Sequence, residues 1–132
     1  MPKFFSMRRI GTVLLSVLFF TACSPDQAVK KYYKASLSGD YAHAGRYVVQ
    51  SQKEAYDLLV QQQTAADRKV LRGRRVQVKD VQSQRTDDSS AVATCMLLVR
   101  ERKQPADTAY RVVLLKKEGR RWKVNNGLLP VH

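Results

Sequence analysis

Few residues in this chain of 132 residues are suited to acid–base or nucleophilic chemistry. The histidines are His43 and His132, and the cysteines are Cys23 and Cys95. Two distant histidines and a cysteine inside an apolar run do not give the ligand spacing of a metal site. Proton transfer needs Asp, His or Tyr groups inside a pocket, and no pattern directs them there. We therefore expect no catalytic residue, no bound metal and no cofactor, in a protein that is not an enzyme.

The acidic residues that stand out have structural explanations. Most of them fall at expected helix caps or turns: Asp40, Asp87, Asp88, Asp107 and Glu118. His43 follows Asp40 by three residues, which is typical of a surface residue in a capped first turn.

Tyrosines offer a second kind of site, because their hydroxyl groups can bind a polar ligand at a pocket mouth. They concentrate in the first half of the chain, and Tyr110 follows later. The candidate pocket residues are Tyr32, Tyr33, Tyr47, Tyr56 and Tyr110. The competing interpretation is that these tyrosines, with Tyr41 and Trp122, pack helices on a sheet.

Basic residues form two groups in a chain of formal net charge +13. The first group contains Arg68, Lys69, Arg72, Arg74, Arg75 and Lys79, and the second contains Lys116, Lys117, Arg120, Arg121 and Lys123. Such groups attract phosphate or carboxylate surfaces, which predicts an anionic partner for the first group. Solubility and favourable contact with a helix dipole are the alternative explanation.

Cys23 closes the sequence Phe20-Thr21-Ala22-Cys23 after a basic cluster and an apolar run over 10–20. This run is too short to cross a hydrocarbon core of roughly 30 Å, so a secretory signal fits better. Residues 1–23 resemble the signal and lipobox of bacterial lipoproteins, although Phe20 stands where Leu is usual. The resemblance implies a signal peptide over 1–22, lipidation of Cys23 and, because Ser24 follows, sorting to the outer membrane. The alternatives are an ordinary signal peptide cut near Ala22, which leaves Cys23 as a free thiol, and an uncleaved helix that acts as a weak anchor.

Lipidation of Cys23 would leave Cys95 without a disulfide partner. Cys95 lies in the apolar run 91–99, where a cysteine usually serves as a small buried side chain. We expect it to be structural.

Helical signals fill the first half of the mature chain. Ser24 and Pro25 predict the start of a helix that ends near Ser38, before Gly39. Asp40 predicts a cap on a second helix that ends near Gln50. A capping box over 51–54 and one continuous apolar face predict a single third helix up to Arg72.

Strand signals fill the second half, where Val, Leu, Thr and aromatic residues are frequent. They predict four strands at about 74–83, 91–102, 108–117 and 121–129, with Trp122 and Val124 on one face. Polar turns at 85–90 and 103–107 and a tight hairpin at Glu118-Gly119 make them an antiparallel meander.

The order of three motifs resembles the nuclear-transport-factor-two-like superfamily, which has the cone-shaped fold of ketosteroid isomerase. The motifs are 28–33 (Ala-Val-Lys-Lys-Tyr-Tyr), 38–41 (Ser-Gly-Asp-Tyr) and 119–124 (Gly-Arg-Arg-Trp-Lys-Val). The closest match is a branch of small bacterial lipoproteins of unknown function. The resemblance implies an α+β fold with three N-terminal helices on a curved four-stranded antiparallel sheet. Pairing into a homodimer through the sheet is a further implication.

We therefore expect one lipid-anchored α+β domain over 23–132 in the bacterial cell envelope, held in the bilayer by acylated Cys23. The predicted function is a non-catalytic binding or assembly module whose basic surface meets an anionic envelope polymer or a partner protein. The alternative is a small-ligand or degenerate enzyme domain with a tyrosine-lined cone. We do not expect nucleic acid as a partner, because an exported protein rarely meets it.

Overall fold

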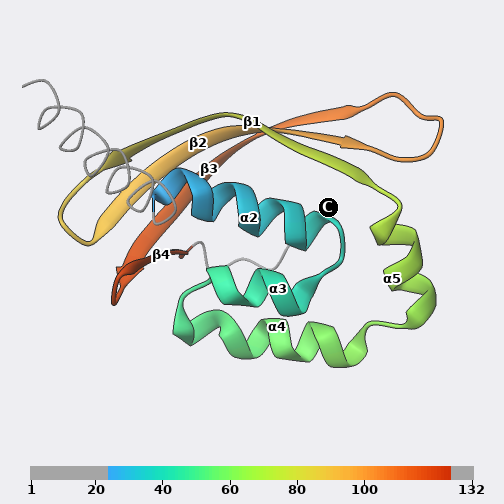
Figure 1. Ribbon diagram of the computed structural model, residues 1–132, viewed down its shortest axis with the longest axis horizontal. Coiled ribbons are helices and arrows are strands. Elements are labelled where there is room, and N and C mark those ends of the chain that lie inside the picture. Colours follow the sequence, from blue (N-terminus) through green and yellow to red (C-terminus); the bar gives the residue numbers. More distant parts are fainter. Residues whose placement is uncertain (1–23, 126–132) are drawn as a thin grey trace, which may run out of the picture.

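The computed structural model describes residues 24–125, which form helices packed on a curved antiparallel sheet (Figure 1). The expected signal peptide over 1–22, the lipidation residue Cys23 and the terminal His132 lie outside these residues. Among residues 24–125, no helix combines the length and the apolar composition needed to span a membrane.

The elements follow one another in the order helices first, strands second. The helices are α2 (Pro25–Leu37), α3 (Tyr41–Ala44), the short 3-10 helix η1 (Gly45–Tyr47), α4 (Gln50–Gln62) and α5 (Ala65–Arg72). The strands are β1 (Arg75–Arg85), β2 (Ser90–Arg100), β3 (Asp107–Glu118) and β4 (Arg121–Val124). They pair in the order β1-β2-β3-β4, each antiparallel to the next. The predicted α+β class and meander are confirmed.

Local signals fix both ends of α2 as expected. The hydroxyl of Ser24 accepts the backbone N–H of Gln27 at 3.3 Å, and Pro25 occupies the first turn. Gly39 has φ +79°, in the left-handed region that favours glycine after a helix. Asp40 then accepts the N–H of His43 at 3.2 Å and caps α3. These caps and the glycine are confirmed, but the second helix ends at Ala44 and is followed by η1 up to Tyr47, so it does not reach Gln50.

The prediction of three helices is wrong, because the third helix is divided into α4 and α5. Gln63 adopts an extended conformation with ψ 126°, and Thr64 begins α5 with its own capping box. Thr64 Oγ1 accepts the N–H of Asp67 at 3.1 Å, and Asp67 Oδ2 accepts the N–H of Thr64 at 3.4 Å. These two local bonds replace the helical bonds that a continuous helix would need there.

The start of α4 also differs from the sequence prediction. The residue that caps it is Val49, not Ser51, and its side chain makes no capping bond. Instead, Glu118 Oε1 at the end of β3 accepts the N–H of Gln50 at 3.0 Å. A carboxylate beside a helix N-terminus is favourable, so a distant strand supplies the cap.

The sheet curls because β1 is irregular. Lys79 pairs with Met96 and Gln82 with Thr94, so Asp80 and Val81 together oppose Cys95, and Asp80 has φ 53°. Such a β-bulge bends its strand and increases the local twist. At the other side of the sheet, Gly119 has φ 62° in the tight β3–β4 turn. The expected continuation of β4 beyond residue 125 lies outside the described residues.

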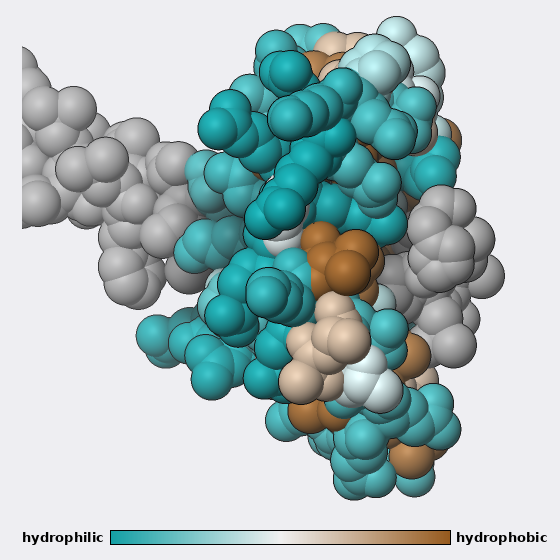
Figure 2. All heavy atoms as spheres, turned by 90° about the vertical axis from the view of Figure 1, so that its right-hand side faces the viewer, coloured by the Kyte–Doolittle hydropathy of each residue, from teal (hydrophilic) through white to brown (hydrophobic). Residues whose placement is uncertain are grey.

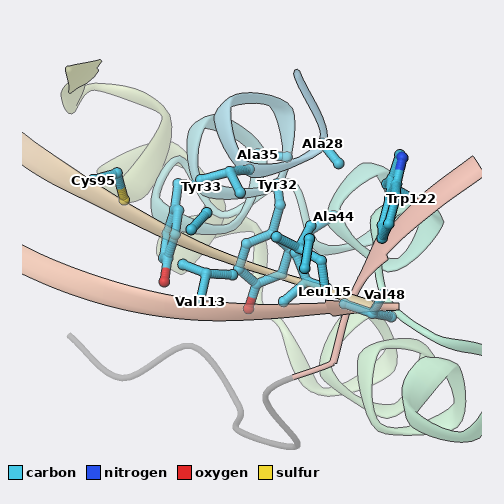
Figure 3. Close-up of a cluster of buried hydrophobic side chains, with 14 of the residues drawn as sticks. Ala28, Tyr32, Tyr33, Ala35, Ala44, Val48, Cys95, Val113, Leu115 and Trp122 are labelled. Atoms are coloured by element: carbon cyan, nitrogen blue, oxygen red, sulfur yellow. The ribbon is translucent and has the colours of Figure 1, made fainter. Parts of the chain in front are cut away.

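The core lies between the inner face of the sheet and α2. Figure 3 shows Tyr32 and Tyr33 projecting from α2 towards Val113 and Leu115 of β3. The other buried side chains in this cluster include Ala28, Val29, Ala91, Ala93, Cys95, Leu97, Trp122 and Val124. Trp122 and Val124 therefore share the inner face, as predicted.

Candidate anion-binding surface

The predicted basic group is carried by α5 and the start of β1, at one end of the sheet (Figure 1). Arg68, Lys69 and Arg72 are exposed on α5, and Arg75 is exposed at the first position of β1. Lys79 lies four residues further along β1, or about 13 Å from Arg75 at the usual rise of a strand. Arg74 lies between α5 and β1, so five of the six predicted residues are close together and Lys79 is separate from them.

The turn between β2 and β3 brings further cations to the same place. Arg100 pairs directly with Arg75 across the two strands. Glu101 Oε1 accepts Arg74 Nε at 2.8 Å, which ties the turn to the end of α5. Arg102 and Lys103 are exposed in that turn. Arg100 and Arg102 fell in the predicted strand over 91–102 and Lys103 in the predicted turn after it, so these cations were not assigned to the basic group.

We call this set the α5 basic surface. Its members are Arg68, Lys69, Arg72, Arg74, Arg75, Arg100, Arg102 and Lys103. Four carboxylates lie nearby. Glu101 is paired with Arg74, and Asp67 caps α5. Asp107 lies at the start of β3, and Asp40 lines a hollow together with Arg68 and Arg72. Positive charge therefore prevails at this end of the molecule.

A surface hollow lies between α5 and the β2–β3 turn. Lys69 and Val70 line it from α5, and Gly73 and Arg74 from the link between α5 and β1. The turn contributes Glu101, Arg102 and Gln104. Val70 is 67% exposed, so the hollow has an apolar element beside its cations. Figure 2 faces this end of the molecule and shows a small hydrophobic area surrounded by hydrophilic residues. A second hollow is lined by Arg68 and Arg72 from α5 and by Asp40.

The exposed cations of this surface can attract anions. Within residues 24–125, Lys69 and Arg102 have no ion-pair partner, whereas Arg74 is held by Glu101. Unpaired cations close together raise the local concentration of anions. The attraction between such exposed cations and an anion weakens as the salt concentration increases. The surface is therefore suited to phosphate or carboxylate groups of a larger partner.

The second basic group surrounds the β3–β4 turn. Lys116, Arg120 and Arg121 are exposed, and Lys117 lies 5.9 Å from the ring centre of Trp122. Lys123 donates from Nζ to the carbonyl of Arg46, and burial together with nearby Arg121 lowers the pKa of Lys123. We call Lys116, Lys117, Arg120, Arg121 and Lys123 the hairpin basic group.

The tyrosines divide into a buried cluster and one outlier. Tyr32 and Tyr56 are buried, and their hydroxyl oxygens lie 2.5 Å apart in a hydrogen bond. Tyr33 packs edge-on against Tyr32 with ring centres 5.0 Å apart. Burial raises the pKa of all three tyrosines, which keeps their hydroxyl groups neutral. Tyr47 packs against the core, but Tyr110 is 76% exposed on the opposite face of the sheet, so the structure does not place it with the others.

Cys95 and His43 both pack against other side chains in the structure. Cys95 is a buried free thiol, as expected, and burial raises its pKa. The ring of His43 packs edge-on against Tyr47 with centres 5.3 Å apart. Within the described part of the chain, no three His, Cys, Asp or Glu side chains come together in a way that could hold a metal ion.

Comparison with known proteins adds information on the fold. No protein-family model and no curated protein matches the chain. Among solved structures, a SEC-C motif containing protein from Rhodopseudomonas palustris is 14% identical with a TM-score of 0.55, over 80% of this chain and 77% of its own. This likeness shows a shared fold and does not extend to function.

A second solved structure is the "Putative NTF2-like transpeptidase" from Campylobacter jejuni. It is 20% identical with a TM-score of 0.49, over 77% of this chain and 97% of its own. Its name includes the superfamily that the order of sequence motifs resembles, and at this score the likeness carries nothing further. Together, fold and site define a small α+β domain with a curled antiparallel sheet and a strongly basic end.

Proposed function

We propose that this chain is a non-catalytic lipoprotein of the bacterial envelope, anchored through acylated Cys23, that binds an anionic component through its α5 basic surface. The partner is an envelope polymer bearing phosphate or carboxylate groups, or the acidic face of a protein in an envelope assembly. The lipobox-like sequence before Ser24 supports the location, and its serine supports the outer membrane.

One observation carries the binding proposal: two segments that are distant in sequence converge to build the α5 basic surface. The salt bridge between Arg74 and Glu101 holds the β2–β3 turn against the end of α5. The directly paired Arg75 and Arg100 place like charges side by side, which is unfavourable for an isolated sheet. A bound anion would relieve that repulsion.

The alternative, a ligand or degenerate enzyme site in a tyrosine-lined cone, has weaker support. The hydroxyl groups of Tyr32 and Tyr56 satisfy each other in the core and need no ligand. Tyr110 faces away from them.

Two matched triple variants test the binding proposal. Arg68→Glu/Lys69→Glu/Arg72→Glu reverses three exposed charges on α5, and Lys116→Glu/Arg120→Glu/Arg121→Glu makes the same change in net charge at the hairpin. Co-sedimentation with isolated peptidoglycan strands, which carry carboxylates but no lipid headgroups, measures binding at low and high salt. Each basic residue near an anionic surface contributes about 1 kcal/mol, so the α5 variant should bind at least about 100-fold more weakly.

The hairpin variant is the control for net charge and should retain most of the binding. Equal loss in both variants would mean that total charge alone attracts these polymers. Unchanged binding by the α5 variant would contradict the proposed surface.

A further inference from the structure

The two basic groups lie at opposite ends of the molecule. In Figure 1, α2 starts beside the β3–β4 hairpin and the β1–β2 turn, while α5 and the β2–β3 turn lie at the other end of the long axis. Contacts between α2 and β4 confirm the first neighbourhood, and Figure 3 shows Trp122 of β4 next to Ala28 of α2. Ser24, where the described chain begins, is therefore at the hairpin end.

The length of α2 sets the separation of these ends. Its 13 residues span about 20 Å at 1.5 Å per residue. At the far end of α2, Leu71 of α5 lies against Gly39. Interactions between exposed charges are screened over about 8 Å at physiological salt. A surface that attracts the hairpin end therefore exerts little force on the α5 basic surface.

The hairpin end carries cations that point to an anionic surface. Lys116, Arg120 and Arg121 are exposed around the β3–β4 turn. Glu118 is the carboxylate within this hairpin, and it accepts the N–H of Gln50. Arg85, from the end of β1, lies 5.4 Å from the ring centre of Trp122 and adds another cation.

Acidic residues at this end reduce the charge without reversing it. Asp26 lies in the first turn of α2, and Asp87 and Asp88 occupy the β1–β2 turn. Asp87 accepts the backbone N–H and the hydroxyl of Ser89. These bonds lower the pKa of Asp87 and keep it ionised within its own turn. The three exposed hairpin cations lie on neighbouring strands and their turn, so they can face a planar surface together.

We infer that the hairpin basic group binds the phosphate headgroups of the membrane that holds the N-terminus, and that this contact turns the α5 basic surface away from that membrane. The inference rests on the proposed anchoring at Cys23. It also narrows the proposed function, because the partner of the α5 basic surface must then lie beyond the headgroup layer of the anchoring membrane.

A fluorescence quenching experiment on the lipidated full-length product tests this orientation. A dye on Thr86→Cys reports on the hairpin end, and a dye on Ala66→Cys reports on α5; both positions are exposed. The protein is reconstituted into vesicles of phosphatidylglycerol with phosphatidylcholine, or of phosphatidylcholine alone, with a headgroup-attached nitroxide as quencher. We expect strong quenching at position 86 and little at position 66 in the anionic vesicles.

The triple variants then assign the cause. Lys116→Glu/Arg120→Glu/Arg121→Glu should abolish the difference between the two positions, whereas Arg68→Glu/Lys69→Glu/Arg72→Glu should leave it intact. Equal quenching at both positions in the parent background, or a difference that persists in the hairpin variant, would overturn the headgroup contact.

Failure of the anchor would be visible separately. The chain without an introduced cysteine should take up no dye, because Cys23 is acylated and Cys95 is buried. Dye on Cys23 would refute the anchor but not the headgroup contact. That contact is then measured with the Cys23→Ser chain, whose flotation with phosphatidylglycerol vesicles should fall on adding salt and on hairpin charge reversal. Flotation that is unchanged by both would overturn it.

Discussion

Tyr32 and Tyr56 show what residue types alone do and do not predict. Their burial agrees with the interpretation that the tyrosines pack helices on a sheet, although Tyr56 was not on the apolar face predicted for its helix. The 2.5 Å bond between their hydroxyl groups joins residues 24 positions apart and depends on how α2 and α4 pack, which no local pattern specifies. For Tyr110 the pocket interpretation failed, because one position along a strand decides which face a side chain occupies.

The Tyr32–Tyr56 bond predicts strong coupling between the two residues. Tyr32→Phe should destabilise the fold by about 1–3 kcal/mol, because it leaves the buried Tyr56 hydroxyl without a partner. The double variant with Tyr56→Phe should lose little more than the single variant, since neither tyrosine hydroxyl is then left without its partner. Urea unfolding measures the cycle, with exposed Tyr110→Phe as a control expected to change stability by less than about 0.5 kcal/mol. Additive losses would contradict the coupling.

At the scale of elements, local signals placed most boundaries and missed one break. The caps at Ser24 and Asp40, the glycine at 39 and the β3–β4 turn were all readable. The division between α4 and α5 was missed because an apolar face continued across it. The spacing of Thr64 and Asp67 is nevertheless that of a capping box, and this local signal in the sequence would have predicted the start of α5. Glu118 as the cap of α4 was not readable, because it acts across 68 positions of sequence.

Gly39 is the element boundary most sensitive to substitution. A Cβ there would lie 2.8 Å from Leu71 Cβ, and the φ of +79° is itself unfavourable for alanine. Gly119 is a matched control, because it has φ +62° and no atom within 4 Å of an added Cβ. Gly119→Ala should cost only the conformational term of about 1–2 kcal/mol, and Gly39→Ala should cost about 1–3 kcal/mol more from overpacking.

Urea unfolding of the two alanine variants measures this difference. Equal losses of unfolding free energy in the two variants would show that Leu71 can move away from Gly39 without cost. That result would contradict the close packing between Gly39 and Leu71.

At the scale of the whole molecule, the two basic groups lie at opposite ends, which the sequence alone does not indicate. Both basic groups are visible as runs of Lys and Arg, but their placement at opposite ends follows from the antiparallel order of the strands and the direction of α2. The same topology adds Arg100 and Arg102 to the first group and removes Lys79 from it. Neither change was predictable from local patterns, because the register that places Arg100 opposite Arg75 depends on the bulge at Asp80.

The fold prediction succeeded at the level of class and strand order because alternating strands and short turns leave few topologies. Function is less constrained, since a fold of this kind can carry many unrelated sites. The proposal therefore rests on the α5 basic surface and on the N-terminal signal, which are separate features of the chain.

The most direct test of the central claim, an envelope lipoprotein, is the intact mass of the protein expressed in a Gram-negative host, together with membrane fractionation. We predict a mature chain that begins at Cys23, carries acyl chains and sediments with the outer membrane, all of which Cys23→Ser should abolish. An unlipidated soluble product from the unaltered chain would contradict the claim and would reopen a disulfide between Cys23 and Cys95.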